Sequence, residues 1–145
     1  MSDRPQSAEN HAQLVTGYHM VGTALLLAVL IYSVVGMVRD FSVPAVMSFV
    51  LAIVLLLVAA YARVFPLGVQ DRVIRLEERM RMERVLPDDL KARIMDVSTN
   101  HLIGLRFAPD EELPDLVRQV LDGSLTTRKE IKAAIKNWRA DNQRI

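Results

Sequence analysis

The amino-acid sequence predicts an all-α membrane protein, built from a two-helix transmembrane hairpin and a small helical module that follows it. Two segments, residues 20–38 and 41–62, contain none of the 18 Lys and Arg or the 17 Asp and Glu side chains of the chain. As helices they would reach about 28 and 33 Å, close to the roughly 30 Å hydrocarbon core of a bilayer. The remainder of a 145-residue chain is too short to surround two such helices with a soluble core.

The hairpin is expected to occupy residues 20–64, with spans at about 20–38 and 44–64. The turn between the spans is short and Pro44 suits the first turn of the second helix, so both ends of the hairpin should lie on one side of the membrane. A cleavable signal peptide is the weaker interpretation of the first span. Only Arg4 precedes it as a basic residue, and its apolar run exceeds that of a typical signal.

Arginine counts beside the spans predict the orientation of the hairpin. The turn holds only Arg39, next to Asp40, whereas six arginines follow the second span: Arg63, Arg72, Arg75, Arg79, Arg81 and Arg84. Cationic segments are translocated poorly across the membrane. We therefore expect a multi-pass protein with both termini in the cytoplasm.

Residues 1–19 are expected to form an N-terminal cytoplasmic tail and interfacial segment. Residues 1–9 are polar, which predicts disorder, and the following residues lead as a helix into the first span. Tyr18 and His19 should sit at the depth of the lipid headgroups. A metal or haem site is disfavoured, because His11 and His19 would lie about 80° apart on a helix and no acidic partner follows closely.

Residues 65–86 are predicted to form an amphipathic connecting helix, separated from the second span by a kink or break at Pro66 and Gly68. An apolar stripe with spacings of 4, 3 and 4 residues follows: Val69, Val73, Leu76 and Met80. This stripe either pairs with another helix or lies on the membrane surface. A dedicated anchor for anionic lipid is disfavoured, because acidic side chains nearly cancel the arginines around the stripe.

Residues 87–145 are predicted to form a cytoplasmic module of four short helices. The first begins at Pro87, and its apolar face ends near Val97; the second follows the candidate caps Ser98 and Thr99. The third is the strongly amphipathic segment from Leu113 to Leu121, which Gly123 should close in a left-handed conformation. A core of this size is marginal without disulfides or metals, and the chain has no cysteine. We expect the module to lean on the connecting helix, the membrane, another copy or a partner.

The fourth helix should begin at a capping box of Thr127 and Glu130 and continue past Trp138. Its outer face is basic, with Lys129, Lys132, Lys136 and Arg139 as interaction candidates. A solvated cationic face is the favoured interpretation, followed by a protein-docking face and then by a site for nucleic acid or anionic lipid. Trp138 falls on the apolar side, which is typical of a core anchor and makes nucleic acid an unlikely partner.

No sequence pattern indicates catalysis, a cofactor or a metal. The chain contains no phosphate-binding loop, dinucleotide turn, nucleophile elbow or zinc-protease motif. The densest acidic cluster is Asp110, Glu111 and Glu112, and we interpret it as the first turn of a helix, where the dipole favours negative charge. We therefore expect no catalytic, cofactor-binding or metal-binding residue, and no enzyme activity.

Four stretches of the sequence are similar to a known family. They are NHAQLVTGYH at 10–19, FPLGVQDRVIRLEERMR at 65–81, GLRFAPDEELPDL at 104–116 and KEIKAAIKNWRADNQR at 129–144. Together they resemble a family of small bacterial two-span membrane proteins of unknown function. The resemblance implies a location in the bacterial inner (cytoplasmic) membrane, and it implies no activity.

These observations favour an inner-membrane accessory or scaffold protein whose cytoplasmic module mediates protein–protein interaction or self-association. The interaction candidates are the stripe on the connecting helix and the basic C-terminal helix with Trp138. The alternative is a membrane-tethered binder of nucleic acid or anionic lipid that uses the basic C-terminal helix.

Overall fold

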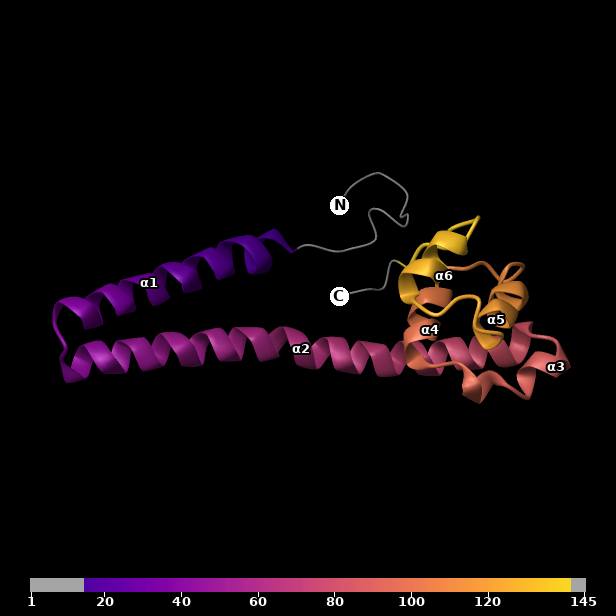
Figure 1. The fold of residues 1–145 in the computed structure, drawn as a ribbon, viewed down its shortest axis with the longest axis horizontal. Coiled ribbons are helices and arrows are strands. Elements are labelled where there is room, and N and C mark those ends of the chain that lie inside the picture. Colours follow the sequence, from indigo (N-terminus) through magenta and orange to yellow (C-terminus); the bar gives the residue numbers. More distant parts are fainter. Residues whose placement is uncertain (1–14, 142–145) are drawn as a thin grey trace. The chain divides into compact units, whose positions relative to one another are not determined.

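The computed structural model describes residues 15–141, which consist of helices and loops with no strand among them. The all-α fold class is thereby confirmed. The described chain divides into two compact units, one up to Leu67 and one from Gly68 onward. Along the chain (Figure 1) the elements are the π-helix η1 (Gly17–Gly22), α1 (Thr23–Arg39), α2 (Val43–Val85), α3 (Asp88–Lys91), the 3-10 helix η2 (Ile94–Asp96), α4 (Thr99–Leu105), α5 (Leu113–Leu121) and α6 (Arg128–Ala134).

The first unit is a helical hairpin whose apolar side chains face outward. The backbone of α1 runs beside the first part of α2 (Figure 1). The Tyr18 hydroxyl of η1 donates a hydrogen bond to the Ala59 carbonyl of α2, and both residues line a groove between the helices. The continuous helical segment Gly17–Arg39, formed by η1 and α1, and helix α2 are each long and apolar enough to cross a membrane. Only 6% of the apolar window of each helix is buried, whereas the core helix of a soluble protein is mostly buried.

Helix α2 continues through Pro66, so the expected break between the second span and residues 65–86 is wrong. A proline inside a helix removes the single hydrogen bond that its missing N–H would have donated to the Ala62 carbonyl. Gly68 weakens a helix by only about 1 kcal/mol relative to alanine. These two local penalties are too small to end a helix of 43 residues that is held on both sides of them.

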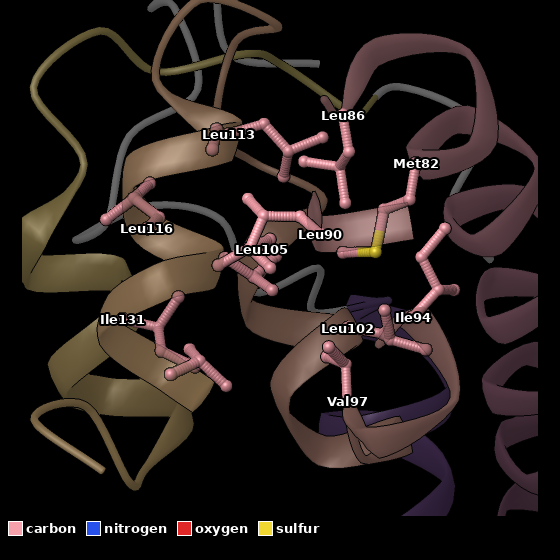
Figure 2. Packing of buried hydrophobic residues seen from close by; sticks show 13 residues of the cluster. Met82, Leu86, Leu90, Ile94, Val97, Leu102, Leu105, Leu113, Leu116 and Ile131 are labelled. Carbon is pink, nitrogen blue, oxygen red and sulfur yellow. The ribbon is translucent and has the colours of Figure 1, made fainter. Parts of the chain in front are cut away.

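The second unit consists of the last part of α2 and the short helices that fold onto it. Figure 2 shows Met82 of α2 and Leu86, which follows its end, packed with Leu90, Leu102 and Leu113. The module therefore leans on the connecting helix, one of the supports that its small size predicts. Burial of this cluster, and not local helix propensity, holds helices as short as four to nine residues in place.

Local start and stop signals place most of the helices in this unit. The Ser98 hydroxyl caps α4 by accepting from the His101 N–H, and Thr127 and Glu130 form the reciprocal capping box at the start of α6. Gly123 follows α5 with a φ of 85°, as a left-handed helix end requires. The first predicted helix differs from its prediction, because it is split into α3 and η2.

The last helix is shorter than predicted, since α6 ends at Ala134 and Ile135 is extended. The N–H groups that would continue the helix have other acceptors. Those of Lys136 and Asn137 donate to the Glu112 carboxylate, each at 2.9 Å, and that of Arg139 donates to the Phe107 carbonyl at 2.8 Å. Contacts with the rest of the module therefore replace the helical bonds that the sequence pattern implies.

Candidate functional site

The apolar stripe Val69, Val73, Leu76 and Met80 lies on the face of α2 that the module leaves uncovered. These four side chains remain between 48% and 62% exposed. The module covers a different row on the same helix, in which Ile74, Glu78 and Met82 are buried. At about 100° per residue, the two rows point roughly 170° apart. The stripe is thus a second packing face with nothing packed against it among residues 15–141.

A shallow groove of about 440 Å³ runs along one side of the stripe. Its floor is apolar and its rim is cationic, and it is lined by Val69, Arg72, Val73, Arg75, Leu76 and Arg79. The Nε atom of Arg79 is buried and has no hydrogen-bond partner within the described part of the chain. A buried polar atom without a partner is unfavourable, so the groove has the features of a surface that another molecule completes.

A second candidate is a charged cavity of about 420 Å³ at the junction of α2 with the C-terminal segment. At its centre is Arg81, which is only 5% exposed. Its guanidinium donates to Asp110 at 2.7 Å, to Glu78 at 3.1 Å and to the Ala108 carbonyl at 2.7 Å. Burial raises the pKa of the Glu78 carboxyl, although Arg81 beside it acts in the opposite direction.

The charges of this cavity are satisfied mostly within the protein. The buried Arg106 pairs with Asp141 at 3.3 Å, and Arg139 approaches Glu78 at 3.8 Å. The two buried arginines therefore each face a carboxylate of their own chain. We interpret the cavity as an ion-pair joint that fastens the C-terminal segment to α2.

The structure does not gather the predicted basic candidates on one helical face. Lys129 lies on α6 and is exposed, and the Lys132 ammonium lies 5.0 Å from the centre of the Phe107 ring. Lys136 and Arg139 follow the end of α6, so their placement on the outer face of a longer helix is wrong. Trp138 also lies beyond the helix, where its ring stacks on Phe107 with centroids 4.5 Å apart.

The acidic cluster is divided among different contacts, and its assignment to the first helical turn is wrong because α5 begins only at Leu113. Asp110 binds Arg81, whereas Glu111 is exposed. Glu112 accepts from the backbone N–H groups of residues 136 and 137, and these bonds lower the pKa of its carboxyl. No local signal in the sequence indicates this contact, because residues 136 and 137 lie 24 and 25 positions after Glu112.

The two histidines of the described residues each make a local or within-unit contact. The Nδ1 atom of His19 lies 3.1 Å from the Val15 carbonyl oxygen, and the Nε2 atom of His101 lies 3.1 Å from the Thr126 carbonyl oxygen. His11 is outside the described residues. Across residues 15–141, no group of three or more His, Asp or Glu side chains is placed to hold a metal ion. The stripe and its groove therefore remain the candidate site.

The family comparison covers the complete chain. Residues 1–145 match the model of a family described as a family of unknown function, DUF6526, and the chain belongs to this family. No curated protein matches the chain, and no solved structure does.

Proposed function

We propose that this protein is an accessory or scaffold protein of the bacterial inner membrane. Its cytoplasmic module would bind another protein chain, either a partner or a second copy, through the stripe on α2. The observation that carries the proposal is the second, uncovered packing face of a helix whose opposite face is already buried by the module. Contiguous exposed apolar surface of this kind is characteristic of interaction sites. The protein would act by holding its partner at the membrane, and no chemical step is assigned to it.

The proposed location rests on the hairpin. Two apolar helices with outward-facing side chains suit a hydrocarbon solvent, and a helix satisfies its own backbone groups there. The arginines that follow the second span favour a cytoplasmic module and cytoplasmic termini. The protein has no cysteine, so single cysteines can report the orientation.

Orientation is tested with Ser42→Cys in the turn of the hairpin and Ser124→Cys in the module. On intact cells, an impermeant thiol reagent should label the first variant and should label the second only after the membrane is permeabilised. The reverse pattern would contradict the proposed topology, and removal of the protein from vesicles by alkaline washing would contradict the membrane location itself.

Docking is tested by mild cross-linking in native membranes with the double variant Val73→Asn, Leu76→Asn. Both side chains are exposed, so their replacement should leave the module folded. The variant should lose the cross-linked species that the unchanged chain forms. Met95→Asn is the matched control, because Met95 is a 71% exposed apolar residue away from the stripe and its replacement should retain the species. Equal cross-linking of both variants would contradict the proposal.

A role of the C-terminal segment in binding nucleic acid or anionic lipid has less support. It requires a continuous basic face, whereas α6 has only seven residues and the Arg139 guanidinium beyond it lies 3.8 Å from the Glu78 carboxylate. Such binding would weaken steeply with added salt and would decrease when Lys129 and Lys132 are neutralised.

A further inference from the structure

We infer that the occupant of the stripe is a second copy of this chain, whose α2 lies parallel to the first and in the same register. This inference rests on the proposed docking function and names its partner. The evidence consists of the position of the stripe in a seven-residue repeat, the shape of the groove and the charges beside it.

The stripe fits the repeat of a two-helix coiled coil. Its spacings of 4, 3 and 4 residues place Val73 and Met80 at the a positions and Val69 and Leu76 at the d positions. In this frame the buried residues Ile74, Glu78, Arg81 and Met82 occupy positions b, f, b and c, which a coiled coil leaves outside its seam. A second helix can therefore pair along the stripe while the module keeps its own contacts.

The groove has the arrangement that such a partner needs. In a coiled coil each a or d side chain enters a hole formed by four residues of the facing helix. The groove is lined by one such set at successive d, g, a and d positions, namely Val69, Arg72, Val73 and Leu76. In parallel pairing this hole receives an a-position side chain, which here is Val73 of the second copy. A β-branched residue at a together with leucine at d favours two strands over three or four.

The flanking charges select the parallel register. Arg72 at a g position would face Glu77 at the following e position of the second copy, and the symmetry of a dimer forms this pair twice. Both side chains are exposed and neither has an ion-pair partner among residues 15–141. The membrane supports the same direction, because the α2 helices of two copies with one topology leave the bilayer on the same side.

The next charge pair opposes association. Arg79 at g would face Arg84 at e of the second copy, and like charges in these positions are unfavourable. The pairing should therefore be limited to the stripe and strengthened when Arg84 becomes acidic. An interface of two heptads is weak in solution, so confinement of both copies to one membrane must raise their effective concentration.

The first experiment uses single cysteines in the full chain, reconstituted into vesicles. Val73→Cys and Leu76→Cys place a thiol in the seam, and each should give a disulfide-linked dimer on mild oxidation. Asp71→Cys is the control, because its f position lies on the side of α2 opposite the seam and outside the groove. A disulfide between single cysteines can join only two copies. Equal dimer yields at positions 73 and 71, or none at 73 and 76, would overturn the inference.

The second experiment exchanges the charges in the Val73→Cys background. Arg72→Glu alone replaces attraction by repulsion at both symmetric pairs and should weaken dimerisation by roughly tenfold. Adding Glu77→Arg should restore dimer yield, since the pair is then rebuilt with reversed signs. Arg84→Glu alone should increase it. Failure of the double exchange to restore the dimer would overturn the register.

The outcomes separate this inference from the proposed function. One outcome would contradict the dimer and support docking: no seam disulfide forms, but the double variant Val73→Asn, Leu76→Asn loses a cross-link between this chain and a different protein. Both fall if the stripe variants change neither the disulfide nor any cross-linked species. A seam disulfide that follows the charge exchange supports both.

Discussion

In the hairpin, Leu25, Ile31 and Val58 leave 60% to 64% of their surfaces exposed, whereas Leu102, Leu105 and Phe107 in the module leave none. The same apolar residue types thus face outward in one unit and inward in the other. Apolar surface is unfavourable in water and not in hydrocarbon, so the outward face of the hairpin suits helices that could cross a membrane, whereas the module buries an apolar core of its own. The stripe on α2 is the exception within the module, since it exposes apolar side chains as the hairpin does.

A matched pair of leucine truncations tests this contrast and should give the largest effect. Leu102→Ala removes a fully buried side chain and should lower the free energy of unfolding by about 2 to 5 kcal/mol. Leu57→Ala removes a side chain that is 53% exposed in the hairpin and should change module stability very little. Urea unfolding of the detergent-solubilised chain, followed by fluorescence of its single tryptophan, measures both. Similar losses in the two variants would contradict the contrast.

The module also buries charged side chains, whose ion pairs can be tested against a pair on the surface. Arg81→Met should destabilise the module by about 3 kcal/mol, since it leaves the buried Glu78 without its main partner. Lys91→Met breaks a pair with Asp88 on the surface and should cost less than about 1 kcal/mol. The same unfolding assay compares the variants. An Arg81 variant as stable as the Lys91 variant would show that the joint between α2 and the C-terminal segment is not structural.

Two glycines test how tightly each unit is packed. An added Cβ at Gly104 on α4 would lie 3.1 and 3.2 Å from Ile131 side-chain atoms of α6, so Gly104→Ala should destabilise the module by about 1 to 2 kcal/mol. Gly36 in α1 has no neighbour within 4 Å of such a Cβ, and Gly36→Ala should be tolerated. Thermal unfolding followed by circular dichroism at the helix band distinguishes them. Tolerance at position 104 would contradict the close approach of α4 and α6.

The smallest expected effect is the acid sensitivity contributed by Glu112. Its hydrogen bonds from the N–H of Lys136 and from Asn137 hold its pKa below the ordinary value near 4.5. The stabilisation is therefore complete above that value and is lost as pH falls through the lowered pKa of the folded state. Glu112→Gln should flatten this part of the stability curve between pH 6 and 3, measured by chemical unfolding at each pH. Glu111→Gln, at an exposed neighbour, should not.

Signals between neighbouring residues were sufficient to predict several elements. The capping box of Thr127 and Glu130, the Ser98 cap and the left-handed Gly123 each depend on groups within a few residues, and each is present as predicted. The apolar stripe was predicted from the periodicity of one helix, and its four side chains are exposed among the described residues. Whether a second copy fills it stays a prediction.

Signals that depend on distant residues were missed. The contact of Glu112 with residues 136 and 137 ends α6 early, and nothing in either segment indicates the other. Arg81 and Asp110 are 29 residues apart, so the sequence near Asp110 does not indicate their contact. Without that contact, the acidic cluster was interpreted as the first turn of a helix. At Pro66 the local signal was misleading. Proline disfavours the interior of a helix, but α2 continues for many residues on both sides of it.

The helical class, the two apolar helices, the helix starts and the presence of a stripe could be predicted from the amino-acid sequence, because each follows from the chemistry and spacing of nearby residues. The end of α6, the burial of particular charges and the face of α2 that the module covers became evident in the folded protein. Those outcomes depend on which backbone and side-chain groups meet when the short helices pack on α2. Packing brings together residues that are far apart in the sequence, so no local pattern indicates which of them meet.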